Sequence, residues 1–112
     1  MILFRSEHVQ PILEGRKTQT RRFWDDERPR VKVGGNYWAA TRLFKPEYRF
    51  ARLYVTALDW MPLDPVSVED ALAEGYESVA AFQDAFKRIN KLDHWPTFEM
   101  VWRVKFRLKA AL

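Results

Sequence analysis

The stretch FEMVWRVKFRLK, residues 98–109, alternates apolar and polar side chains without a slip. Every second residue from Phe98 to Leu108 is apolar, and the residues between them are charged, with Val101 the one exception. This period of two predicts a long strand that has one buried face and one face in water. We therefore expect Trp102, Val104 and Phe106 in the core, as part of the strand that closes the chain.

Two helices are predicted immediately before this strand. Ser67 is placed to cap a helix over residues 68–73, which Gly75 ends, and Ser78 is placed to cap a second helix that extends to about Asn90. In the second helix, apolar residues recur every three or four positions and predict a stripe that faces the core: Val79, Phe82, Phe86 and Ile89.

The first half of the chain reads mainly as strands. Residues 50–60 are β-branched and aromatic and predict a central strand, whereas residues 31–38 read as strand, Gly turn and strand. Residues 18–24 read as a short strand or an extended loop. A first strand over residues 2–4 and a helix over residues 7–14, capped by Ser6 and ended by Gly15, begin the chain.

This order, in which few strands are separated by helices, argues against a doubly wound parallel sheet. It predicts an α+β fold: a small, mainly antiparallel β-barrel with about three helices. The length of 112 residues fits a single domain over residues 1–112.

Composition excludes several kinds of chemistry. Without cysteine, the chain has no disulfides, no thiolate zinc site and no cysteine nucleophile. His8 and His94 lack acidic partners at metal-ligand spacing, and no phosphate-loop or dinucleotide glycine pattern is present. We therefore expect neither a metal nor a cofactor. The start lacks the features of a signal peptide and no run is long enough to span a membrane, so the expected location is the cytoplasm, with no membrane partner.

The positive charge is concentrated in one segment. The formal net charge is +4, and residues 15–32 hold seven cationic side chains against three acidic ones, which equals the whole excess. Such a segment is either a footprint for a polyanion such as RNA or an ordinary solvated surface, and charge alone does not separate the two.

The run from Ile12 to Arg22, ILEGRKTQTRR, resembles the signature of the ASCH family, whose members continue a first strand and helix with Gly-basic-Lys-Thr-x-Thr-x-Arg. Residues 30–34 resemble the family's strand before a Gly turn, and residues 73–76 its Glu-Gly-aromatic junction before a helix. Residues 101–106 occupy the position of its last strand. The resemblance thus covers nearly the whole chain in order.

The resemblance implies a PUA-like barrel with a cleft beside the first helix, and a function associated with RNA. One branch of the family hydrolyses the acetyl amide of N4-acetylcytidine with a lysine, a threonine and a glutamate, and ribonuclease activity is attributed to other members. Carried over to this chain, the three catalytic residues are Lys17, Thr20 and Glu74. The chain departs from that branch after Thr18, where Gln19, Arg21 and Phe23 stand in place of the branch's Ile, Ile and Asp, while Arg22 matches its Arg.

The residue types suit this chemistry. A threonine hydroxyl attacks an amide only if a base accepts its proton, and a desolvated lysine of lowered pKa can do so while a glutamate orients it. The alternative is that Lys17 only sits at a helix C-terminus while Thr20 is an ordinary strand residue.

The remaining candidates would bind RNA or a modified nucleoside. Arg21 and Arg22 point to opposite sides of an extended run, so one can reach a phosphate while the other pairs with a nearby carboxylate. Trp24 and Trp38 lie near the basic segment and could stack on a base, whereas Trp60 and Trp102 are expected in the core. The predicted RNA- or nucleotide-binding set is Arg16, Lys17, Thr18, Arg21, Arg22, Trp24 and Trp38.

Overall fold

A computed structural model describes all residues from 1 to 112. Its five strands are β1 (Ile2–Leu3), β2 (Gln19–Arg22), β3 (Asn36–Ala40), β4 (Arg49–Pro62) and β5 (Met100–Ala111). They form one sheet in the order β1-β3-β4-β5-β2, in which only the β1–β3 pair is parallel. The predicted α+β, mainly antiparallel fold is confirmed.

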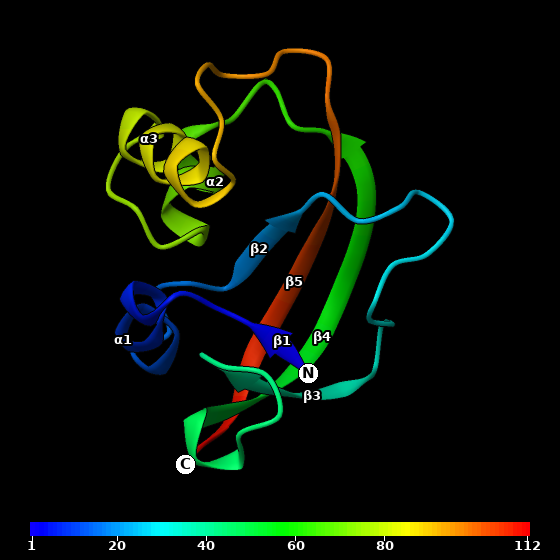
Figure 1. The fold of residues 1–112 in the computed structure, drawn as a ribbon, viewed down its shortest axis with the longest axis vertical. Coiled ribbons are helices and arrows are strands. Elements are labelled where there is room, and N and C mark those ends of the chain that lie inside the picture. The colour runs from blue at the N-terminus through cyan, green and yellow to red at the C-terminus, as the bar shows by residue number, and fades with distance from the viewer.

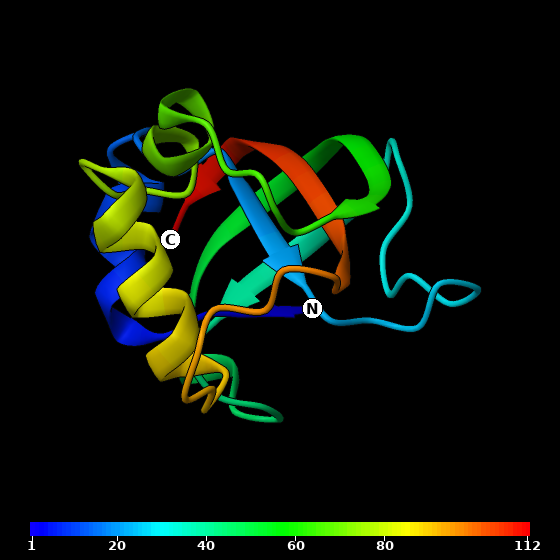
Figure 2. The ribbon, with the colours of Figure 1, turned by 90° about the horizontal axis from the view of Figure 1, so that it is seen from above.

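Three α-helices decorate the sheet: α1 (Val9–Leu13), α2 (Val68–Ala73) and α3 (Val79–Ile89). Two short 3-10 turns, η1 (Ser6–His8) and η2 (Pro46–Tyr48), complete the structure. Figure 1 shows α2 and α3 together beside one end of the long β4–β5 ribbon, and Figure 2 shows the helices on the side of the molecule opposite the loop between β2 and β3. No helix is both long and apolar enough to cross a membrane.

Local signals place α2 and α3 where the sequence predicts them. The Ser67 hydroxyl accepts a hydrogen bond from the backbone of Asp70, and the Asp70 carboxylate accepts one from the backbone of Ser67. The Ser78 hydroxyl caps α3 by accepting from the backbone of Ala81. Each cap satisfies N–H groups that a helix start otherwise leaves without a partner.

The sheet curls into a half-barrel that stays open between its two edges, β1 and β2. A side chain links these edges in place of a backbone ladder, because the Arg22 guanidinium donates to the carbonyl of Leu3 at 2.6 Å. The gap between the edge strands is therefore narrow and polar on one wall.

Two apolar clusters hold the layers together. The larger lies inside the curl and joins Ile2, Ile12, Leu53, Val55, Val104 and Phe106 with their neighbours. The smaller packs α2 and α3 onto the other face of the sheet and contains Leu63, Ala71, Phe82, Phe86 and Val101. Both faces of β5 are thus buried over part of its length.

This arrangement corrects the prediction that β5 has a single apolar face. Val101, on the face read as polar, is fully buried beneath the helices, whereas Phe98 precedes the strand and is 97 % exposed. Trp102 is only half-buried and Trp60 is 38 % exposed, so the expectation that both fill the core is wrong. These two rings pack on each other, with centroids 5.4 Å apart.

Two other local predictions also differ from the structure. Residues 31–33 form no strand, because β3 already has β1 and β4 on its two sides and offers no free edge. The first helix is shorter than residues 7–14, since residues 6–8 form a 3-10 turn and the Ser6 side chain caps nothing. Gly15, at φ +77°, ends α1 as expected.

We predict that Phe86→Ala lowers the free energy of unfolding by about 3–5 kcal/mol, because it opens a cavity in the cluster under α3. Phe98→Ala truncates a phenylalanine that is exposed to water, and should change the free energy of unfolding by less than about 0.5 kcal/mol. Urea unfolding of both variants measures the difference. Equal losses would show that the helix layer is misassigned.

Candidate functional site

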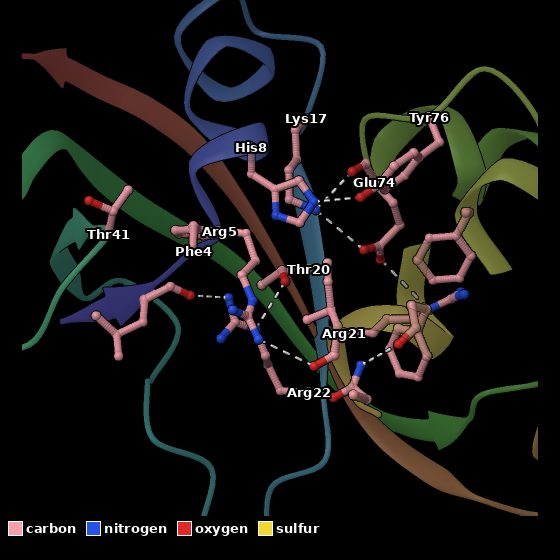
Figure 3. Close-up of a pocket in the computed structure, with 15 residues that line it drawn as sticks. Phe4, Arg5, His8, Lys17, Thr20, Arg21, Arg22, Thr41, Glu74 and Tyr76 are labelled. Atoms are coloured by element: carbon pink, nitrogen blue, oxygen red, sulfur yellow. Dashed lines mark hydrogen bonds and ion pairs between the residues drawn. The ribbon is translucent and has the colours of Figure 1, made fainter. Parts of the chain in front are cut away.

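Most of the predicted site residues line one cavity at the open side of the half-barrel. Its volume is about 350 Å³, and its walls come from the end of β1, η1, β2, the end of α2 and α3. Among the lining side chains are Lys17, Thr20, Arg21, Arg22 and Glu74. In Figure 3, Lys17 reaches Glu74 from the segment before β2, whereas the Arg21 and Arg22 side chains leave β2 on opposite sides.

The backbone before β2 brings Lys17 to this wall. The amide of Lys17 donates to the carbonyl of Pro11, and the amide of Thr18 donates to the carbonyl of Ala73 at the end of α2. Gly75 follows with φ +97°, and a Cβ there would lie 3.2 Å from the Lys17 side chain. Glycine thus permits both the turn and the close approach of the two segments.

Lys17 and Glu74 form a buried pair, with side chains 2 % and 3 % exposed. The Lys17 ammonium donates to the backbone carbonyl of Glu74 at 2.8 Å and to its carboxylate Oε1 at 3.4 Å. Burial lowers the pKa of Lys17, and the negative charge of Glu74 opposes this shift. The Lys17 side chain therefore reaches the C-terminal end of α2, while its backbone follows the end of α1.

The second oxygen of Glu74 is held by Gln19, which sequence reasoning did not select. The Gln19 amide donates to Glu74 Oε2 at 3.0 Å, and the residue is 2 % exposed. The alternation of side chains along a strand would have indicated this residue, because Gln19 and Arg21 share one face of β2. Gln19 is thus one of the groups that fix the orientation of the Glu74 carboxylate.

Arg21 is buried beside this pair. Its side chain is 0 % exposed, its Nη2 lies 3.1 Å from Asp70 Oδ2, and its guanidinium carbon lies 5.7 Å from the centre of the Phe82 ring. Burial raises the pKa of Asp70, but the charge of Arg21 and the Ser67 hydrogen bonds outweigh it, so the net pKa is lowered. None of the three guanidinium nitrogens of Arg21 makes a hydrogen bond of good geometry within the protein.

Thr20 and Arg22 lie on the opposite face of β2, which faces the interior of the curl. Arg22 Nε donates to Thr20 Oγ1 at 3.0 Å, and the Arg22 guanidinium lies over the Phe4 ring at 5.1 Å. Burial lowers the pKa of Arg22 to about 10. No hydrogen bond joins the Lys17 ammonium to the Thr20 hydroxyl; the hydroxyl oxygen accepts from Arg22, so its own proton remains free to donate.

His8 also lines the cavity, although the sequence analysis considered it only as a metal ligand. Its Nε2 lies 2.6 Å from the hydroxyl of Tyr76, and Figure 3 shows its ring beside the end of Lys17. Burial, followed by the positive charge of Lys17, lowers the pKa of His8 to about 3. His8 is therefore neutral at pH 7 and can be a hydrogen-bond donor or acceptor in the wall.

Four of the predicted binding residues lie outside the cavity. Arg16 is exposed and pairs with Glu14 at 2.7 Å, and the Thr18 side chain is exposed as well. Trp24 packs against the interior cluster, and Trp38 lies on β3 between two arginine side chains. The structure thus separates the predicted set into a buried group around Lys17 and Arg21 and a group on the surface.

The fold and its cavity define a class, that of α+β half-barrels with a polar cavity between their edge strands. Within this class the fold is ASCH-like, as its similarity to a solved structure shows. An ASCH domain from Lactobacillus crispatus has a TM-score of 0.68 at 16% identity, over 89% of this chain and 69% of that one.

A second similar structure is a protein of Enterococcus faecalis described by the family model DUF984. It has a TM-score of 0.67 at 19% identity, over 94% of this chain and 68% of that one. By sequence, no family model and no curated protein matches the chain. The comparisons therefore establish the architecture that the motif in residues 12–22 implied.

We predict that acid destabilises the protein partly through His8. Its pKa is about 3 in the folded state against about 6.5 in an unfolded chain, so between these values only the unfolded state binds the proton. Stability should fall as pH decreases through this window, by up to about 1.4 kcal/mol per pH unit for one proton. Denaturant unfolding at pH 6, 5 and 4 measures the slope.

The matched variant is His8→Gln, whose amide can still bond to the Tyr76 hydroxyl but does not titrate. The free energy of unfolding of this variant should depend less steeply on pH than that of the wild type, by the equivalent of about one bound proton. Identical slopes would mean that His8 is protonated in the folded state.

Proposed function

We propose that the cavity binds a nucleoside or nucleotide, either free or as an unpaired residue of an RNA. The observation that carries this proposal is the concentration of cationic residues in the cavity wall, which includes Lys17 before β2 and both Arg21 and Arg22 on it. A phosphate or base carbonyl in the cavity would give these cationic groups acceptors that the protein supplies only in part, since Arg21 has a carboxylate neighbour but no hydrogen bond of good geometry.

The charge of the wall supports an anionic or strongly polar ligand. Four cationic side chains line the cavity, Arg5, Lys17, Arg21 and Arg22, against the single carboxylate of Glu74. Asp70 pairs with Arg21 from behind and offsets part of this excess. Guanidinium groups suit phosphate because two parallel N–H bonds match two oxygens.

The size and the apolar part of the wall support a single nucleoside unit. A volume of about 350 Å³ is at the low end of the range of small-ligand sites, about 300–1,000 Å³. The rings of Phe4, Tyr76, Phe82 and Phe86 line it and offer apolar contact for the face of a base.

We predict that cytidine 5′-monophosphate binds more tightly than cytidine, and that Arg21→Gln weakens binding of the monophosphate by about 10- to 100-fold, the loss of one charge-assisted contact. Isothermal titration calorimetry measures both affinities. Arg16→Gln is the matched control, since it removes a neighbouring positive charge outside the cavity and should leave binding unchanged.

Equal losses in both variants would show that only general charge matters. Absence of binding by a folded wild type for any nucleoside or nucleotide of a panel would overturn the proposal. Unfolding measurements on Arg21→Gln separate a lost contact from a lost fold.

A second candidate function is hydrolysis of an acyl amide on a nucleoside. The observation that favours it is the dry environment of Lys17, which is 2 % exposed and has a lowered pKa, as a general base requires. An open, solvent-facing lysine would instead have favoured simple phosphate contact.

In this candidate mechanism the Thr20 Oγ forms a bond to the acyl carbon and its proton passes to a neutral Lys17. The C–N bond then breaks and the amine leaves with the proton from Lys17. Water hydrolyses the acyl-threonine ester and releases the carboxylic acid. Glu74, held by Gln19, orients Lys17, which has to turn from Glu74 toward Thr20 in the reacting complex.

If this mechanism operates, Lys17→Ala, Thr20→Ala and Glu74→Ala each nearly abolish release of acetate from N4-acetylcytidine. The losses should not add, because the three groups act as one proton-transfer unit. Thr18→Ala is the control, since that side chain is exposed and should retain activity. Turnover that survives Lys17→Ala would disprove the mechanism, and no turnover of any acylated nucleoside would retire the enzymatic function.

A further inference from the structure

The outer face of the sheet is covered by helices at one end only. On β5, Val101 and Arg103 lie beneath α2 and α3, where Val101 packs against Phe82 and Arg103 pairs with Asp70. The following residues of the same face, at alternate positions, are exposed: Lys105, Arg107 and Lys109.

The strand register adds residues of β3 and β4 to this open end. Trp38 pairs with Arg52, and Tyr54 pairs with both Asn36 and Arg107, and residues paired across antiparallel strands share a face. Arg49 lies over the Trp38 ring from the start of β4. We call this surface the basic sheet face; it consists of Trp38, Arg49, Arg52, Tyr54, Lys105, Arg107 and Lys109.

The cations of the basic sheet face are not neutralised. None of its five cationic side chains forms an ion pair. Neither β3 nor β5 contains a carboxylate, and the one on β4, Asp59, pairs with Arg103 near the helices. The charges therefore add to a positive field over the open end of the sheet.

The segment of residues 15–32 does not have such a field. Of its seven cations, Lys17, Arg21 and Arg22 line the cavity and Arg16 pairs with Glu14. The three that remain exposed, Arg28, Arg30 and Lys32, share a loop with three exposed carboxylates. The footprint expected from sequence is thus largely internal or balanced, whereas the basic sheet face is neither.

Aromatic rings and guanidinium groups interleave on the basic sheet face. Arg52 and Arg49 lie over the Trp38 ring at 4.2 and 4.8 Å, and Arg107 lies over Tyr54 at 4.7 Å. These two stacks are set two residues apart along β4, about 6–7 Å at the rise of a strand. Flat guanidinium and aromatic planes are surfaces on which unpaired bases stack, and the charges can contact phosphates.

We propose that the basic sheet face is a docking surface for single-stranded nucleic acid, separate from the cavity. Charge complementarity selects a polyanion, and the stacked rings select one that carries planar bases. None of the large apolar side chains that the molecule exposes belongs to this face, so it has nothing to insert into a bilayer. An acidic peptide would match the charge and leave the stacks unused.

This proposal does not rest on the function assigned to the cavity, because the two sites share no residue. A protein that docks RNA on the basic sheet face and binds no nucleotide in the cavity would support the first and refute the second. The experiments below use variants that leave the cavity intact.

The test is fluorescence anisotropy of a labelled 12-nucleotide oligo-uridine with the full chain over a salt series. Contacts to three to five phosphates predict a log–log slope of about −2 to −3.5. The variant Lys105→Gln/Arg107→Gln/Lys109→Gln removes three exposed cations and should flatten the slope by about 2. The control is Arg28→Gln/Arg30→Gln/Lys32→Gln, which removes the same charge from the loop and should leave most of the slope.

Equal flattening by both triple variants would overturn the proposal, because total charge would then explain the binding. Poly-glutamate of matched charge that competes as well as oligo-uridine would exclude a nucleic acid as the specific partner. Tighter binding to phosphatidylserine vesicles than to RNA, if it is lost in the Lys105→Gln/Arg107→Gln/Lys109→Gln variant, would assign the face to membranes instead. No binding to oligo-uridine at low salt would reject the surface altogether.

Discussion

The arrangement of the site depends on one buried ion pair, Lys17 with Glu74. Two charges removed from water are costly unless their remaining hydrogen-bonding capacity is satisfied, and here it largely is. The ammonium bonds the Glu74 carbonyl as well as its carboxylate, and Gln19 bonds the second carboxylate oxygen. The pair joins the segment before β2 to the end of α2, so it fixes the position of the helix layer at the cavity.

This constraint also determines where the positive charge of the molecule acts. Arg21 and Arg22, a few residues after Lys17, are drawn into the interior with it, where Arg21 pairs with Asp70 and Arg22 bonds Leu3 across the open edges of the sheet. Arg21 contributes little to a long-range field, because its buried charge lies beside the carboxylate of Asp70. The positive surface without ion pairs therefore comes from alternate residues of β5, a part of the chain in which cationic residues do not form a run in the sequence.

The sequence predicted what is decided locally. Ser67 and Ser78 cap the helices because their hydroxyls bond backbone amides three residues away, and Gly15 and Gly75 adopt the positive φ expected at helix ends. The grouping of Lys17, Thr20, Arg21 and Glu74 followed from resemblance to a family, since residues 57 positions apart meet only through the fold. Their roles stay predictions until they are measured.

The rest was decided by contacts that no local pattern contains. The alternation of apolar and polar residues assigned Phe98 and Val101 to the wrong environments. Phe98 precedes β5 and is exposed, whereas Val101, on the outer face of the strand, is covered by α2 and α3. His8 gave no signal at all: its burial depends on Tyr76, 68 residues later. Trp38 was selected for nearness to a basic segment in sequence, yet its cationic neighbours, Arg49 and Arg52, come from β4.

The two surfaces of the molecule should discriminate among ligands by different physics. A ligand bound in the cavity as proposed would form hydrogen bonds with buried groups, where an unmatched donor is expensive, so its affinity should depend on its shape and polarity and little on salt. On the basic sheet face, water remains and charges are screened, so the proposed binding there should depend on the number of phosphates and weaken with ionic strength. A polymer that carries the unit recognised by the cavity could use both, and the affinity of the open face would then raise the local concentration at the closed one.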